Sequence, residues 1–69
     1  MNQKLENSQK DLQRANDYDL FLSLLVKRES ALNTIKTSKN QFVKRDRYKQ
    51  VVKLNNQING LKRKWGFKE

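Results

Sequence analysis

The sequence predicts an all-α fold, a helical hairpin of two long antiparallel helices, and two observations lead to it. The 69 residues include no proline and only two glycines, so few positions force a helix to break. Apolar residues in the C-terminal half recur at spacings of three and four, which line one side of an α-helix. These residues are Val51, Leu54, Ile58, Leu61 and Trp65.

Residues 1–16 form a polar segment in which Leu5 and Leu12 are among the few apolar side chains. We expect this segment to be helical and loosely held. Asn16 fits the N-cap of a new helix, so a short extra helix jointed at Asn16 and a continuous helix from about residue 3 both remain open. In a continuous helix Leu5 and Leu12 lie on the same side as Ser23 and miss the main core, which favours a joint or a separate partner for this segment.

The hairpin itself is predicted over residues 17–69, and its first helix over about 18–36. At 100° per residue the apolar side chains of this helix cover roughly 240°, whereas an ordinary surface helix shows an apolar arc of about 100°. One neighbouring helix cannot cover so wide an arc, and a chain this short buries only about 60% of its unfolded surface. We therefore expect a homodimer that packs as a coiled-coil-like bundle. The expected interface residues are Leu20, Phe21, Leu24, Leu25, Leu32 and Ile35.

The turn is predicted at residues 37–40 and the second helix over about 39–65. The apolar stripe shifts by two residues at this point, which argues against one unbroken helix. Ser38 and Gln41 have the spacing of a capping box. At the other end Gly66 is placed to end the second helix, which lets Phe67 fold back on the hairpin. Gly60, inside the second helix, is interpreted as a tolerated surface glycine.

The net charge of +9 lies entirely in the second half of the chain. Residues 1–33 carry five basic and five acidic side chains, whereas residues 34–69 carry eleven basic side chains and only Asp46 and Glu69 as acids. The excess positive charge therefore belongs to the second helix and its surroundings. Such a distribution favours an anionic partner.

The basic side chains of the second helix gather nearly opposite its apolar stripe, on a face about 27 Å long. Such a face attracts the phosphates of nucleic acid, and Tyr48 and Trp65 could stack on bases, although both also fit the core. The sequence therefore predicts a nucleic-acid partner, without distinguishing DNA from RNA. The predicted binding residues are Lys44, Arg45, Arg47, Lys49, Lys53, Asn56, Lys62, Arg63 and Lys64.

Enzymatic chemistry has no support in the sequence. The chain contains no histidine and no cysteine, its acidic residues are scattered, and no phosphate-binding glycine loop or hydrolase motif occurs. We expect no catalytic residues, no metal and no cofactor. The longest apolar run, Leu20 to Val26, is far below the roughly 20 residues that span a bilayer, so we expect no membrane insertion and a cytoplasmic location.

The leading hypothesis is a small accessory or regulatory protein that binds nucleic-acid backbone. The alternative is a protein-binding inhibitor, adaptor or assembly factor that docks through its wide apolar helix or offers its basic face to an acidic protein surface. The abundance of lysine and asparagine is typical of AT-rich genomes, which suggests a phage or plasmid protein acting in a bacterial cell.

Overall fold

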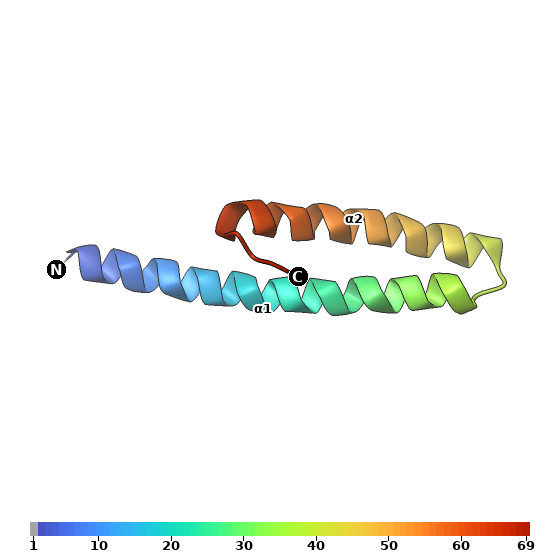
Figure 1. Ribbon diagram of the computed structural model, residues 1–69, viewed down its shortest axis with the longest axis horizontal. Helices are drawn as coiled ribbons and strands as arrows, with labels where there is room; N and C mark the ends of the chain where they lie inside the picture. The colour runs from blue at the N-terminus through green and yellow to red at the C-terminus, as the bar shows by residue number, and fades with distance from the viewer. Residues whose placement is uncertain (1) are drawn as a thin grey trace.

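The computed structural model describes residues 2–69, and the side chains of residues 8–69. It contains two helices, α1 (Asn2–Thr37) and α2 (Gln41–Trp65), which run antiparallel as a hairpin measuring 59 × 17 × 15 Å (Figure 1). Residues 2–69 include no strand, and no helix in this part of the chain is long and apolar enough to cross a membrane. The predicted all-α helical hairpin is confirmed.

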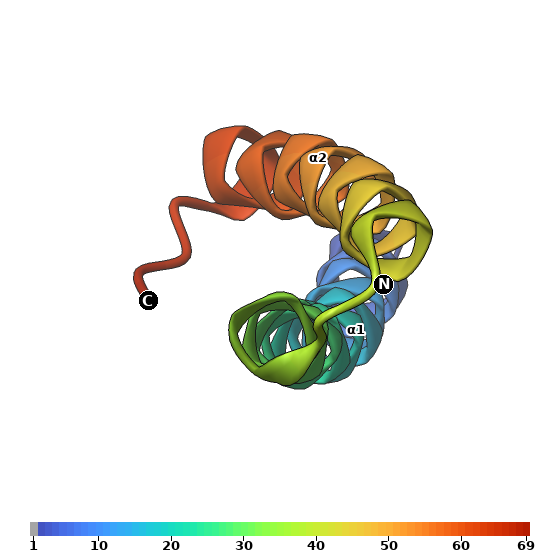
Figure 2. The same cartoon turned by 90° about the vertical axis from the view of Figure 1, so that its right-hand side faces the viewer.

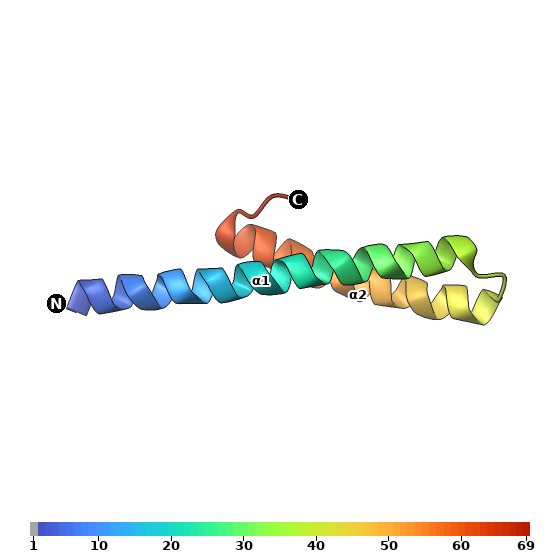
Figure 3. The ribbon, with the colours of Figure 1, turned by 90° about the horizontal axis from the view of Figure 1, so that it is seen from below.

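Helix α1 is continuous through Asn16, so the joint that we favoured there is absent. Asparagine costs only a few tenths of a kcal/mol inside a helix, and no glycine or proline interrupts this stretch. At 1.5 Å per residue α1 is about 54 Å long and α2 about 38 Å, so the N-terminal part of α1 extends beyond α2 (Figure 3). In this overhang Leu12 is 63% exposed, whereas Leu5 lies outside the side chains that the structure describes.

The turn is capped by Asn40 and not by the predicted capping box. The Asn40 side chain accepts hydrogen bonds from the backbone N–H groups of Phe42, at 2.9 Å, and Val43, at 3.4 Å. Ser38 instead stabilises the turn itself, because its hydroxyl accepts a hydrogen bond from the Asn40 backbone N–H at 3.2 Å. Since an asparagine cap satisfies amides that the first turn leaves unpaired, α2 begins at Gln41, two residues later than expected.

The core lies between the two helices and is small. Phe21 and Leu24 of α1 meet Ile58 of α2, and Ala31 and Val51 are buried closer to the turn. The partly buried side chains around this core are Leu25, Leu54, Leu61 and Trp65. The predicted apolar stripe of α2 therefore faces α1, as its spacing indicated.

The C-terminal tail closes one side of the hairpin. Gly66 adopts the left-handed conformation, with φ of 72°, and its backbone N–H donates to the Lys62 carbonyl, so the predicted C-cap is confirmed. This reversal sends residues 67–69 back along the hairpin on one side of the two helices (Figure 2). Phe67 is buried there, with its ring centroid 5.2 Å from that of Tyr18 and 5.3 Å from that of Phe21.

Two carboxylates connect the tail and α2 to α1. Glu69 pairs with Arg28 of α1 and with Lys62 of α2, and Arg28 also donates to the Asn55 side chain at 2.9 Å. Asp17 accepts a hydrogen bond from the Trp65 indole N–H at 2.7 Å and lies 3.3 Å from the Lys64 ammonium. Arg28, which falls within the predicted apolar arc, is thus satisfied by a carboxylate and an amide.

These contacts make stability sensitive to acid. The hydrogen bonds from Trp65 and Lys64 hold the pKa of Asp17 below its ordinary value of 3.8, and those from Lys62 and Arg28 hold the pKa of Glu69 below 4.5. A lowered folded-state pKa stabilises the fold above the unfolded pKa, and this stabilisation disappears as pH falls through the folded pKa.

We expect the melting temperature, followed by circular dichroism, to fall as pH drops from about 5 to about 2. Asp17→Asn should reduce this acid sensitivity, because asparagine keeps an acceptor for the Trp65 indole and carries no charge. Asp19→Asn is the control, since Asp19 is exposed and takes no part in the ion pairs found among residues 8–69. An Asp17→Asn variant as acid-sensitive as the unmodified protein would contradict this role.

Candidate nucleic-acid interface

The basic strip consists of side chains on the outer face of α2, opposite buried Val51 and Ile58. We define it as Arg45, Lys49, Lys53, Asn56 and Arg63, all of which are exposed. Its members fall within about 80° of one another around the helix and extend over about 27 Å of its axis. Helix α2 carries eight basic residues against one acid, Asp46, so the strip lies in a strongly positive field.

The other four predicted binding residues lie at the borders of the strip and are placed differently. Lys62 pairs with Glu69, and Lys64 with Asp17, so both are partly neutralised within the hairpin. Lys44 is half-buried, and exposed Arg47 donates to the Gln50 side chain at 2.9 Å. The cations most available to an outside partner are therefore those of the basic strip.

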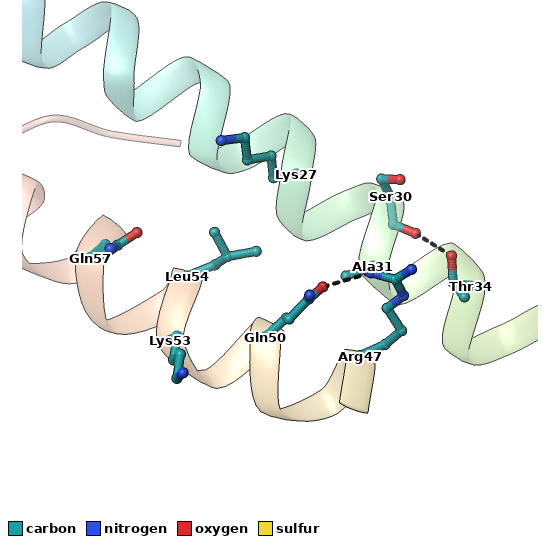
Figure 4. Close-up of a pocket in the computed structure, with 9 residues that line it drawn as sticks. All are labelled: Lys27, Ser30, Ala31, Thr34, Arg47, Gln50, Lys53, Leu54 and Gln57. Atoms are coloured by element: carbon teal, nitrogen blue, oxygen red, sulfur yellow. Dashed lines mark hydrogen bonds between the residues drawn. The ribbon is translucent and has the colours of Figure 1, made fainter. Parts of the chain in front are cut away.

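An open groove of about 500 Å³ lies between the helices beside the strip (Figure 4). Three cations line it: Lys27 from α1, and Arg47 and Lys53 from α2. Apart from Leu54, the remaining lining residues are polar or small, and none is acidic; they are Ser30, Ala31, Thr34, Gln50 and Gln57. The groove therefore offers positive charge and hydrogen-bonding groups, the combination that phosphate and sugar groups require.

Lys27 is a candidate binding residue that the sequence analysis missed. It belongs to the electrically neutral half of the chain, so the charge distribution gave no reason to select it. The relevant signal is the polar edge formed by Lys27, Ser30 and Thr34 at helical spacing, which only the packing of α1 against α2 brings beside Lys53. The hairpin thus extends the cationic surface from α2 onto α1.

The residues predicted for a dimer interface separate into three groups. Phe21 and Leu24 are buried inside the hairpin, at 0% and 4% exposure, so they have no surface left for a second copy. Leu25 and Ile35 are half-buried. Leu20 and Leu32 remain 48% and 43% exposed, but lie on opposite flanks of α1.

One side of α1 nevertheless carries an apolar flank, which we define as Leu22, Leu25, Val26 and Leu32. These four side chains lie within about 120° of one another, on the same side of the hairpin as the tail. Leu22, Val26 and Leu32 are 42%, 70% and 43% exposed. Leu20 lies on the other flank, in a direction about 20° from that of Lys27.

The two aromatic residues considered for base stacking also differ. Trp65 is half-buried and donates its indole N–H to Asp17, so it belongs to the hairpin. Tyr48 is 63% exposed on α2, and Phe42, in the first turn of the same helix, is 79% exposed. The exposed aromatic surface of α2 therefore lies near the turn.

Among the residues that the structure describes, no cluster of three or more acidic, histidine or cysteine side chains could hold a metal ion. Comparison with known proteins adds nothing to these geometric observations. The chain matches no protein-family model, no curated protein and no solved structure.

Proposed function

We propose that this protein is a small, non-enzymatic accessory protein that binds the phosphate backbone of nucleic acid through the basic strip of α2. The observation that carries the proposal is the exposure of Arg45, Lys49 and Lys53 on a face from which the carboxylates of Asp17 and Glu69 are absent. These three cations are about 6 Å apart along the helix axis and can act together on one strand. Lys27 adds a fourth cation from α1, across the groove.

The test replaces Arg45, Lys49, Lys53 and Arg63 with glutamine. Glutamine is a good helix former and all four positions are exposed, so helicity should be unchanged. Affinity for nucleic acid should fall steeply with salt in the unmodified protein. The slope of log affinity against log salt should decrease by up to about 0.7 to 0.9 for each phosphate contact removed.

The control makes the same change of charge away from the strip, at Lys10, Arg14, Lys36 and Lys68, all of which are exposed. Both variants lose four positive charges, so a general effect of net charge should lower their affinities equally. A site-specific effect lowers only the affinity of the strip variant. Equal losses, or no binding by the unmodified protein at low salt, would refute the proposal.

A homodimer is the second part of the proposal, and the apolar flank supports it. A compact monomer of 8.3 kDa exposes about 4,600 Å², whereas this hairpin exposes 5979 Å². The excess, about 1,400 Å², comes from the elongated shape and the overhang of α1 as well as from the flank, and it exceeds the roughly 800 Å² that each partner buries in a standard interface. The half of the chain that contains the flank has no net charge, although exposed Glu29 lies within the arc of the flank. Two copies can meet there with their basic strips on the outside.

The same flank supports the rival function, an inhibitor, adaptor or assembly factor that binds another protein. The two proposals differ in a measurable way. A protein that is monomeric at all accessible concentrations leaves the flank free for a foreign partner, whereas a stable dimer covers it. The acidic-protein alternative for the basic strip predicts binding to acidic polypeptides and none to nucleic acid.

A further inference from the structure

The turn end of the hairpin carries a second hollow, of about 750 Å³, whose chemistry differs from that of the inter-helix groove. Phe42, Tyr48 and Ile35 supply apolar surface, and Lys44, Arg45 and Lys49 supply three cations around it. We call this feature the tip hollow. None of its lining residues is acidic.

The aromatic side chains of the tip hollow are not buried in the core of the hairpin. Phe42 is 79% exposed and Tyr48 is 63% exposed, although burying an aromatic side chain would stabilise the fold. By contrast Phe21 and Phe67 are buried in the core. We therefore infer that Phe42 and Tyr48 contact a ligand or partner outside the hairpin.

The charge of the hollow determines which occupant fits. A second copy placed over it would bring Lys44, Arg45 and Lys49 of one chain against the same three cations of the other, which is unfavourable. A nucleotide satisfies both parts of the lining, because its base stacks on an aromatic ring and its phosphate pairs with a cation. Arg45 and Lys49 also belong to the basic strip, so a strand bound along α2 reaches the hollow without interruption.

We propose that the tip hollow binds unpaired bases, so that the protein prefers single-stranded nucleic acid over duplex. This inference rests on the proposed function and specifies its substrate. In a duplex the base faces are stacked on one another, so Phe42 and Tyr48 have no ring face to contact. The two aromatic residues are about 9 Å apart along the helix axis, too far to enclose one base, so each contacts a separate base.

The test compares three probes of equal length: an oligothymidylate, an abasic strand with the same phosphates, and a duplex. The unmodified protein should bind oligothymidylate more tightly than the abasic strand, by about fivefold or more for each stacked base. The variant Phe42→Leu/Tyr48→Leu keeps apolar, helix-forming side chains and removes the aromatic faces. It should bind the oligothymidylate and the abasic strand alike, with unchanged affinity for the abasic strand and the duplex.

Two controls make this result specific. Leu12→Ala removes an exposed apolar side chain from the N-terminal part of α1, at the opposite end of the hairpin from the turn, and should keep the preference for oligothymidylate. Ring-proton NMR signals of Phe42 and Tyr48 should move upfield when oligothymidylate is added and stay in place with the abasic strand. Both the preference and the NMR shifts report contacts to bases, separately from the affinity for the nucleic-acid backbone.

Equal binding of oligothymidylate and the abasic strand by the unmodified protein would overturn the inference while leaving backbone binding intact. A preference that survives in the double leucine variant would overturn it as well. A change in oligomeric state in that variant would also overturn it. Binding of polyglutamate that requires Phe42 and Tyr48 would overturn it too, because either result would show that the hollow binds protein. If the unmodified protein binds none of the three probes at low salt, the proposed function is refuted instead.

Discussion

Replacing Phe21 with alanine should unfold most of the hairpin. The Phe21 side chain is 0% exposed and its ring lies against those of Tyr18 and Phe67, so alanine leaves a cavity between α1, α2 and the tail. Substitutions of this kind cost about 3 to 5 kcal/mol, which is comparable with the whole stability of a domain this small. Circular dichroism at room temperature should show a large loss of helicity.

Phe42→Ala is the matched control, because it removes the same side chain from a position that is 79% exposed. Its free energy of unfolding, measured in urea, should stay within about 0.5 kcal/mol of that of the unmodified protein. If both substitutions destabilise the protein equally, the core does not lie where the structure places it. A folded Phe21→Ala variant would lead to the same conclusion.

Leu32→Asp should dissociate the proposed dimer. Leu32 is 43% exposed in the hairpin, so aspartate is tolerated in a single chain, but in the dimer it buries an unpaired charge in each copy. A total cost of about 3 kcal/mol per dimer, counting both copies, corresponds to an increase of roughly a hundredfold in the dissociation constant. Light scattering over a range of concentrations measures this change.

Leu20→Asp provides the comparison, since Leu20 is 48% exposed on the opposite flank of α1. This variant should dimerise as the unmodified protein does. Leu25 is less suitable for the test, because it packs against the core and its substitution also destabilises the hairpin. A monomeric unmodified protein, or equal effects at Leu20 and Leu32, would rule out a dimer formed through the apolar flank.

The parts of the fold that sequence predicts well are those set by local chemistry. The change of phase near residue 38 identified the turn, because two stripes out of register cannot belong to one straight helix. Gly66 was recognisable as a C-cap because few other residues adopt φ near +72° without strain. Gly60 is exposed with open space around it, as a tolerated surface glycine should be.

The parts that sequence did not predict depend on which residues meet across the hairpin. Asp17 is near the start of the first predicted helix, and no neighbouring residue in the sequence indicates that it accepts a hydrogen bond from the Trp65 indole. The same reason explains why Lys27 was overlooked and why Phe21 and Leu24 were assigned to a dimer interface. An apolar arc shows that a helix needs neighbours, but it does not show which part of the arc each neighbour covers.

Because α1 extends beyond α2, the free energy of opening its backbone hydrogen bonds differs along its length. Beyond the end of α2 its backbone hydrogen bonds have no packed neighbour, and an isolated helical stretch of this length is marginal in water. Its amides should therefore exchange with deuterium through local fraying, whereas those of Phe21, Leu24 and Ala31 should exchange only when the whole hairpin opens. Amide exchange is therefore fast in one part of α1 and slow in the other, although the helix is continuous. The boundary between the two parts lies near Asp17, where Trp65 anchors the end of α2.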